Sequence, residues 1–595
     1  MQAEAAASSA CSAPAVVLDR LREEWRAPEA RARLREEFRS ARPYPHAVLR
    51  PFLGEAALRA VRADLTRLAA EEKETDLFRF FQTTSLVPSE QPGAEARPAK
   101  RQKTDAKAAG AGPSGSCDAK AAAPGPGEAA TVGASLKSLT ELFASEDFRR
   151  LCADVSGCGE LSDRLDLSSQ IYPHGGHLLC HDDVIGTRRI SFIYYLTDPD
   201  EEWTASEGGA LELYPPDASG AQPAACPTKE VLPLSDALAF FVVEPGVSFH
   251  AVREVRGGRA RMSIQGWLHA PSLDAAPRSS TLQQILGSPD VAAARAAASG
   301  QGPLTAEDRA LLSRWLAPEY LEGELLPAIS QSFADASYVL LTSFLRAEIA
   351  EEVVGALAEA DKADCVGAEG AEPEVPAYSA GAVDGWTLVG PPHLRRYLSY
   401  SPAPGAAACH GRLGAGLQRL KEELLSTGAF RRWVSMCTGL EPRSEAGAEV
   451  RRFRPGMDYT VAARAGGTPP DAFELDATLM FTASGKEVAE VWAGEEVGGF
   501  DSYVEADDQT AETVEAQEVY RGSDDGPLVN LPATCNALAL VMRDARTLRF
   551  VKYLGGDAPS SRVDISASFA VDPPEGQSSD EEAAGGAAGS SSGSA

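Results

Sequence analysis

Leu179-Cys180-His181-Asp182-Asp183 is a short segment that ends in an H-x-D pair, formed by His181 and Asp183. A second histidine, His250, follows downstream in a Ser-Phe-His segment. Two histidines and one carboxylate on one face of a metal form the facial triad of non-haem Fe(II) oxygenases, which leaves positions open for a co-substrate and O₂. The sequence therefore predicts that His181, Asp183 and His250 bind one iron ion and carry the catalysis.

Strand geometry explains how these residues could reach one metal. Residues two apart on a strand point to the same face, so His181 and Asp183 are expected side by side. A lone H-x-D pair is more often a surface turn than a ligand pair. Here residues 240–245 read as a strand and a turn that return His250 to the same pocket.

A zinc cluster is the competing interpretation. His174, His177 and His181 are closely spaced, and five of the eight histidines lie between residues 174 and 269. This cluster would leave His250 and Arg261 without a role, so we favour the iron triad.

An R-x-S pair, Arg261 and Ser263, lies in a strand-like segment after the second histidine. A guanidinium binds a carboxylate through two parallel hydrogen bonds, and the hydroxyl adds a third donor. We predict that this pair binds an anionic co-substrate, with Tyr195 as a further donor to the same carboxylate. Spacing alone leaves two alternatives open, a solvent-facing arginine and a core tyrosine.

Composition limits the class of protein. A chain of 595 residues predicts about two to four domains. The net charge of −30 disfavours direct nucleic-acid binding and suits either solubility or a basic protein partner. No stretch approaches about 18 apolar residues, residues 1–17 make a poor signal peptide, and the ten cysteines lack C-x-x-C spacing. We therefore expect reduced thiols, no membrane association, and a location in the nucleus and cytoplasm.

Many short strands with turn signals predict a mainly β fold with flanking helices, of the sandwich or jelly-roll type. Helices are expected at 18–38, 55–72, 136–155, 306–316 and 340–360, and strands at 47–49, 189–196, 209–214, 237–243 and 261–269, with mostly strands from 395 to 570. The expected segments are an N-terminal tail and helix (1–30), a catalytic domain (31–270) with a disordered insertion (88–133), a connector with helices (271–334), a second β-rich domain (335–570) and a disordered acidic tail (571–595).

Several segments together resemble one eukaryotic family. They are Tyr172–Asp183, Arg188–Leu196, Gly208–Tyr214, Val247–His250, Arg261–Trp267 and, towards the C-terminus, Trp315–Tyr320, Arg395–Leu398, Arg451–Arg454, Gly498–Tyr503 and Ala537–Asp544. The resemblance is to the 2-oxoglutarate- and Fe(II)-dependent prolyl 3-hydroxylases that modify a decoding-centre protein of the small ribosomal subunit. That family includes yeast proteins linked to translation termination and to oxygen-dependent control of a sterol transcription factor.

The resemblance implies two tandem double-stranded β-helix (jelly-roll) domains, the second without a metal site. Only His393 and His410 follow His269, and neither begins an H-x-D or H-x-E motif. The resemblance also implies that Arg261 and Tyr195 hold 2-oxoglutarate, with Fe(II), O₂ and L-ascorbate as the other small molecules. The implied partner is a basic small-subunit ribosomal protein as substrate, together with translation termination or transcription factors.

Two alternative functions stay open. One is an oxygenase that acts on another protein side chain or on a nucleic-acid base, for which Arg253, Arg256 and Arg259 would supply a cationic mouth. The other is a regulator that acts mainly by binding partners. A basic cluster at 98–103 is a candidate nuclear import signal, and 578–582 resembles an acidic-directed kinase site.

Overall fold

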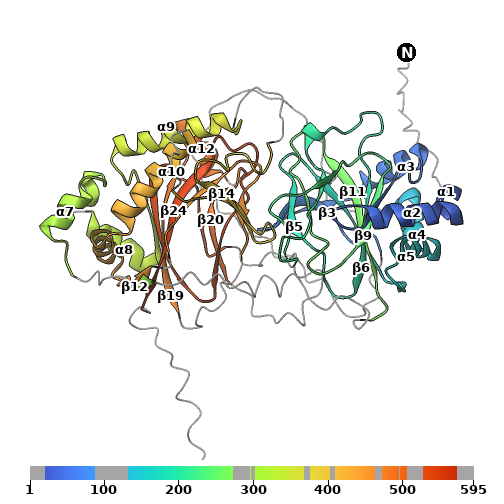
Figure 1. The fold of residues 1–595 in the computed structure, drawn as a ribbon, viewed down its shortest axis with the longest axis horizontal. Helices are drawn as coiled ribbons and strands as arrows, with labels where there is room; N and C mark the ends of the chain where they lie inside the picture. Colours follow the sequence, from blue (N-terminus) through green and yellow to red (C-terminus); the bar gives the residue numbers. More distant parts are fainter. Residues whose placement is uncertain are drawn as a thin grey trace, which may run out of the picture.

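The computed structural model describes most of the chain as two β-rich lobes that lie side by side (Figure 1). The described residues are 21–87, 132–220, 222–272, 295–296, 302–323, 325–367, 376–402, 409–445, 447–462, 472–494, 496–505 and 527–572. The predicted insertion, the predicted acidic tail, the basic cluster and the kinase-like motif lie almost entirely outside these residues. We call the two lobes the N-terminal barrel (strands β1–β11) and the C-terminal barrel (strands β12–β24).

The N-terminal barrel is one curled sheet of eleven strands in the order β1-β9-β6-β11-β4-β3-β5-β10-β7-β8, with β2 paired to β3. Its strands are β1 (His46–Leu49), β2 (Ala70–Glu74), β3 (Phe78–Thr83), β4 (Leu165–Tyr172), β5 (His177–His181), β6 (Arg188–Tyr195), β7 (Leu211–Leu213), β8 (Lys229–Val231), β9 (Leu238–Val242), β10 (His250–Val252) and β11 (Arg261–His269). Successive side chains of β11 point to opposite faces of the sheet. Ile264 and Leu268 pack against the flanking helices, so Arg261 and Ser263, on the other face, point into the barrel interior.

Helices cover the outer face of this sheet, at the far end from the C-terminal barrel (Figure 1). They are α1 (Glu23–Arg26), α2 (Pro28–Ser40), α3 (Glu55–Leu65), α4 (Ala134–Ala144) and α5 (Glu146–Ser156), with a short 3-10 turn η1 (Ala205–Glu207) in a loop. The helix expected at 136–155 is divided at Ser145, whose hydroxyl accepts a hydrogen bond from the backbone N–H of Phe148 and caps α5. The helix expected at 55–72 was too long: it ends at Leu65, and the following residues form β2.

The C-terminal barrel contains a ten-stranded sheet with the path β13-β22-β19-β24-β17-β15-β14 and a three-stranded sheet, β21-β20-β23. Its strands are β12 (Arg295–Ala296), β13 (Tyr338–Thr342), β14 (Trp386–Val389), β15 (Arg395–Tyr400), β16 (Ser444–Glu445), β17 (Glu449–Phe453), β18 (Tyr459–Thr460), β19 (Phe473–Phe481), β20 (Asp501–Glu505), β21 (Val529–Leu531), β22 (Ala537–Asp544), β23 (Thr547–Val551) and β24 (Arg562–Val571). Its helices are α7 (Ala306–Leu312), η3 (Pro318–Tyr320), α8 (Leu326–Ala336), α9 (Ala347–Ala363), α10 (Cys409–Leu420), a π-helical turn η4 (Lys421–Leu425), α11 (Gly428–Thr438) and α12 (Lys486–Ala493).

Two predictions for this half were wrong. The expected helix at 340–360 begins only at Ala347, because Val339 and Leu341 alternate as buried residues of β13, which pairs with β22. Helices α10 and α11 lie in a region that was expected to form strands, and their apolar faces join the main core of the barrel. Helices α7 and α8, expected in a connector, also pack on this core.

The two barrels repeat one strand order. The path β1-β9-β6-β11-β4-β3 of the first corresponds, strand by strand, to β13-β22-β19-β24-β17-β15 of the second. One glycine of each barrel lies equally close to a backbone carbonyl group. A Cβ on Gly208 would lie 1.9 Å from the carbonyl oxygen of Glu254, and a Cβ on Gly498 would lie 1.9 Å from the carbonyl oxygen of Tyr553. The chain is therefore an internal repeat of one β-sheet architecture.

Among the described residues, no helix has the length and apolar character that crossing a membrane requires. Eight cysteines lie within the described ranges, and each of them is a free thiol.

Candidate active site

Two adjacent strands bring the predicted metal ligands together. In the antiparallel pair of β5 and β10, His250 lies directly opposite His181, and their ring centroids are 4.2 Å apart. Asp183 lies beyond the end of β5 and has a left-handed backbone, with φ of 63°. The expectation that His181 and Asp183 share one face of a strand was therefore wrong in detail, and the left-handed backbone of Asp183 beyond the strand brings its carboxylate to the histidines. A non-glycine residue in this conformation is uncommon, although aspartate tolerates it better than most.

The three side chains are buried and converge on one point. Asp183 Oδ1 lies 3.4 Å from His181 Nε2, and Asp183 Oδ2 lies 3.4 Å from His250 Nε2. The Nδ1 atom of His181 is 2.8 Å from the carbonyl oxygen of Leu179, and that of His250 is 2.9 Å from the carbonyl oxygen of Ser248. These contacts place the ring proton on Nδ1, so both Nε2 lone pairs are directed at the carboxylate and are available to a metal.

The electrostatics of the site suit a cation. Burial alone would raise the pKa of Asp183, but the charges of His250 and His181 outweigh it and hold that pKa well below its usual range. Burial and the proximity of His181 lower the pKa of His250, which favours its neutral form. Because metals bind the ionised carboxylate and the neutral imidazole, both shifts favour coordination. The pKa of His181 moves the other way: burial alone would lower it, but the hydrogen bond to Asp183 and the charge of that carboxylate outweigh burial and raise it.

Arg261 is buried within the barrel next to this cluster of side chains. Its Nε donates to the carbonyl oxygen of Gly209 at 2.9 Å, and its Nη1 donates to Ser263 Oγ at 3.1 Å. Its Nη2 has no hydrogen-bond partner among the described residues. Ser263 thus orients the arginine, and Nη2 is left to bind a ligand.

The hydroxyl of Tyr195 is also buried, with the guanidinium of Arg261 beside it as a donor to its oxygen and with no acceptor for its proton among the described residues. Tyr195 lies directly opposite Ser263 in the pairing of β6 with β11. Burial raises its pKa, so the hydroxyl keeps its proton and can donate. The guanidinium of Arg261 lies 4.7 Å from the ring of Tyr172 and 5.1 Å from that of Tyr195, which favours the cation. Nη2 of Arg261 and the hydroxyl of Tyr195 are thus two donors without an acceptor, beside one positive charge. Together they form a site for a carboxylate.

The sequence interpretation missed a second group of unpaired donors in the barrel. The guanidinium of Arg188 lies 3.6 Å from the ring centroid of Trp267, and its Nη1 is 3.7 Å from Asp183 Oδ1. Nε and Nη1 of Arg188, Nε1 of Trp267 and Oγ of Ser191 are buried, with no hydrogen-bond partner in the described ranges. The available signal was the two-residue period of β11, which places Trp267 on the same face as Arg261.

Two regions of the chain match known protein families. Residues 167–269 match the family described as "2OG-Fe(II) oxygenase superfamily", and residues 307–577 match "Oxoglutarate and iron-dependent oxygenase degradation C-term". The chain is 34% identical to "Prolyl 3,4-dihydroxylase OGFOD1" of Ostreococcus tauri over 539 residues, which cover 89% of this chain and 95% of the relative. It is also 27% identical to "Prolyl 3-hydroxylase OGFOD1" of Xenopus laevis (86% and 83% of the two chains) and 29% identical to that of Mus musculus (69% and 73%). The chain belongs to the OGFOD1 family of 2-oxoglutarate- and Fe(II)-dependent oxygenases.

The side chains present in this OGFOD1-family protein fit iron and 2-oxoglutarate. Among the described residues, His181, Asp183 and His250 are the one group of such side chains whose ligand atoms all lie within 4.8 Å of one another. Both oxygens of Asp183 and Nε2 of His250 are buried without a hydrogen bond in the described chain, as Nη2 of Arg261 is. Buried polar atoms are normally satisfied, so these are the atoms that a metal and a carboxylate would engage.

The competing zinc cluster is not formed. His174 Nε2 lies 2.5 Å from Asp557 in the C-terminal barrel, and the ring of His177 packs on Tyr553 at 4.1 Å. The described positions do not bring either ring to His181 as a co-ligand.

Two of the three arginines that were considered for a cationic mouth, Arg253 and Arg259, are engaged elsewhere. Arg259 pairs with Glu207 at 2.7 Å, and Arg253 is largely buried, with its Nη2 donating to the carbonyl oxygen of Pro376 in the C-terminal barrel. A nucleic-acid surface built from these two side chains is therefore not supported.

The C-terminal barrel has a counterpart of Arg261. Arg562 begins β24 as Arg261 begins β11, and its Nη1 donates to the carbonyl oxygen of Gly499 at 2.6 Å. Its Nη2 donates to Asp501 at 2.6 Å and to Asp564 at 2.8 Å. Asp564 stands where the first barrel has Ser263, two residues after the arginine. Both terminal nitrogens of Arg562 are therefore engaged by the protein itself.

Proposed function

We propose that this chain uses Fe(II), 2-oxoglutarate and O₂ to hydroxylate C3 of one prolyl residue in a basic protein of the small ribosomal subunit. The observation that carries the reaction class is the convergence of His181, Asp183 and His250 in the same barrel as a buried Arg261 with a free Nη2. The names of the relatives, which are prolyl hydroxylases, support the type of residue. The net charge of −30 supports a basic substrate, because opposite charge accelerates encounter.

Iron and 2-oxoglutarate, when bound, supply the oxidation of a carbon–hydrogen bond by O₂, with succinate and CO₂ as co-products. The protein supplies geometry and a shielded pocket. The Nε2 atoms of His181 and His250 and the carboxylate of Asp183 would hold the metal. Nη2 of Arg261 and the hydroxyl of Tyr195 would hold the distal carboxylate of 2-oxoglutarate and so fix its orientation.

The walls of the N-terminal barrel offer hydrogen-bond donors to a peptide substrate. Arg188 and Trp267 have donors without a hydrogen bond among the described residues, and these can donate to a carbonyl oxygen of the peptide main chain. Because both side chains are buried, a hydrogen bond at this position is formed away from water and discriminates strongly against a misplaced peptide.

A second candidate is dihydroxylation of the same proline. It is favoured by the name of the relative with 34% identity, a prolyl 3,4-dihydroxylase, whereas the relatives with 27% and 29% identity are named prolyl 3-hydroxylases.

Partner binding and location belong to the same proposal. We infer contacts with translation termination or transcription factors in addition to turnover, and a location in the nucleus and cytoplasm. The eight free cysteines in the described ranges are compatible with a reducing compartment.

Mass spectrometry of the basic ribosomal substrate tests the proposal. The substrate is incubated with the full chain, Fe(II), 2-oxoglutarate and ascorbate, with His181→Ala and Asp183→Ala as matched controls. We expect a gain of one oxygen atom on one proline that both variants abolish, and a gain of two oxygen atoms would support dihydroxylation. Succinate formation without a modified ribosomal protein would discard this substrate, and full succinate production by either variant would discard the metal assignment.

A further inference from the structure

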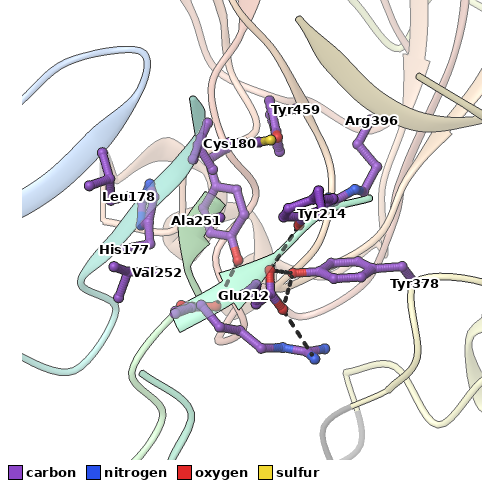
Figure 2. A pocket seen from close by; sticks show the side chains of 14 residues that line it. His177, Leu178, Cys180, Glu212, Tyr214, Ala251, Val252, Tyr378, Arg396 and Tyr459 are labelled. Carbon is purple, nitrogen blue, oxygen red and sulfur yellow. Dashed lines mark hydrogen bonds and ion pairs between the residues drawn. The ribbon is translucent and has the colours of Figure 1, made fainter. Parts of the chain in front are cut away.

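The C-terminal barrel packs against the outside of the strands that carry the two metal-ligand histidines. In β7, Leu211 and Leu213 face the interior of the N-terminal barrel and pack with Tyr195. Glu212 therefore points the other way, towards the C-terminal barrel, and it is only 1% exposed. The hydroxyl of Tyr378, from the C-terminal barrel, lies 2.9 Å from each oxygen of this carboxylate (Figure 2).

Tyr378 is an effective donor because burial and the neighbouring Glu212 raise its pKa to about 12, so the hydroxyl keeps its proton. A second donor comes from Tyr214, whose hydroxyl lies 2.8 Å from Glu212 Oε2. Arg396 of the C-terminal barrel donates in turn to the hydroxyl of Tyr214 at 2.8 Å. Figure 2 shows these groups converging on Glu212 at the boundary between the barrels.

Two guanidinium groups flank this cluster. The guanidinium of Arg396 lies 3.7 Å from the ring centroid of Tyr378, and that of Arg253 lies 4.7 Å from the same centroid. Arg253 Nη1 is also 3.5 Å from Glu212 Oε1. Removing one member of a buried polar network leaves its partners unsatisfied, so the members act together.

The strand register connects this cluster to the metal ligands. Glu212 lies opposite Ala251, and its neighbour Leu213 lies opposite His250. His250 in turn lies opposite His181. The ring of Phe249, which precedes His250, also packs against a residue of the C-terminal barrel, with a centroid distance of 5.0 Å to His393.

The local structure explains why an external support matters. Strands β7 and β10 have three residues each, and the pairing of β10 with β5 shifts register between His250 and Val252. Such a short ladder supplies few hydrogen bonds to fix the direction of an imidazole, whereas a metal site needs its ligands held closely.

We propose that Tyr378 and Arg396 are positioning residues for the metal site: they fix the outer face of β7 and β10, and with it the histidines on the inner side. This inference rests on the proposed role of His181 and His250 as metal ligands. It gives the C-terminal barrel a specific task in catalysis, although its residues do not touch the reacting atoms.

Metal affinity of the full-length chain tests the inference, with Mn(II) as the probe and calorimetry and electron paramagnetic resonance as readouts. Tyr378→Phe keeps the ring between the two guanidinium groups and removes only the hydroxyl donated to Glu212. We expect its Mn(II) affinity to fall about tenfold, the lower end of the effect of outer-shell partners. The same variant should require more Fe(II) for half-maximal turnover and should recover its kcat at saturating Fe(II).

Tyr397→Phe is the matched control. The hydroxyl of Tyr397 donates to Glu449 at 3.0 Å within the C-terminal barrel, so its loss reports general destabilisation of that barrel. Glu212→Gln gives a second test from the other side of the interface and should weaken Mn(II) binding in the same direction as Tyr378→Phe.

The outcomes separate the inference from the metal assignment. If His181→Ala abolishes Mn(II) binding while Tyr378→Phe and Glu212→Gln both bind as the wild type does, the positioning role is overturned and the metal site stands. An equal loss of affinity in Tyr397→Phe would also overturn it. Unchanged Mn(II) binding by His181→Ala would overturn both the metal site and the inference built on it.

Discussion

Replacement of Arg261 by lysine tests the co-substrate site at its most specific point. The guanidinium uses Nε on Gly209 and Nη1 on Ser263, so Nη2 is the terminal nitrogen directed at a ligand, and the hydroxyl of Tyr195 is the second donor. Arg261→Lys keeps the positive charge and loses the fixed planar fork.

The magnitude follows from the bonds that are lost. A hydrogen bond to a charged group contributes about 1.5–3 kcal/mol, and lysine loses about one such bond to the distal carboxylate of 2-oxoglutarate. Because about 1.4 kcal/mol corresponds to a factor of ten, the KM for 2-oxoglutarate should rise about 10- to 100-fold. The distal carboxylate is held equally before and during the reaction, so kcat should change little.

The assay measures succinate formation against the concentration of 2-oxoglutarate, with circular dichroism to establish that the variant is folded. Arg562→Lys is the matched control, because Arg562 occupies the corresponding place in the C-terminal barrel and already binds Asp501 and Asp564. It should lower stability and leave the KM unchanged. A folded Arg261→Lys protein with an unaltered KM would refute the reasoning, as would an equal rise in KM for Arg562→Lys.

Three further outcomes are expected. Tyr195→Phe should raise the KM for 2-oxoglutarate about fivefold, since it removes one neutral donor worth about 1 kcal/mol, and an unchanged KM would exclude this hydroxyl from the site. Burial lowers the pKa of His177 to about 3. The imidazole therefore binds a proton near pH 6.5 in the unfolded chain, whereas it stays neutral at that pH in the folded chain. The free energy of unfolding should therefore be highest above about pH 6.5 and fall by about 2 kcal/mol on going down to pH 5. In thermal melts, His177→Gln should make stability less dependent on pH over this range. Gly208→Ala should lower the urea midpoint far more than Gly186→Ala, because both positions have positive φ but only the first would bring a Cβ within 1.9 Å of a carbonyl oxygen, that of Glu254; equal losses would contradict this.

The metal ligands could be predicted because their chemistry is explicit in the residue types. His181, Asp183 and His250 follow a recognisable order of ligand types, and the structure brings all three together. The path of the backbone was less predictable, since Asp183 reaches the site from a residue with left-handed backbone beyond the strand and not from the strand itself. Local periodicity could not show this, because the conformation of that residue is set by the packing around it.

Secondary structure was predictable where one period dominated. The nine residues of β11 agree with the prediction at both ends, 261 and 269. The start of the helix expected at 340–360 was wrong because residues 338–342 are apolar at positions that suit either period, and pairing with β22 decides between them.

The contacts between the barrels could not be predicted from sequence. Glu212 and Tyr378 are 166 positions apart, and each looks like an ordinary surface residue in its own segment. Their proximity is a product of how the two barrels dock. The same holds for Arg188 and Trp267, which come into contact through the pairing of β6 with β11.

In the C-terminal barrel, carboxylates of the chain itself bind the arginine where a separate carboxylate ligand could otherwise bind. A free dicarboxylate competes for a guanidinium at its cellular concentration, whereas a carboxylate of the same polypeptide is present at an effective molarity that no metabolite attains. In this chain Asp501 and Asp564 act on Arg562 as such tethered ligands. The place proposed for a transient ligand in one half of the molecule is thus occupied by the chain's own carboxylates in the other, and Arg562 keeps these partners whatever the metabolic state of the cell.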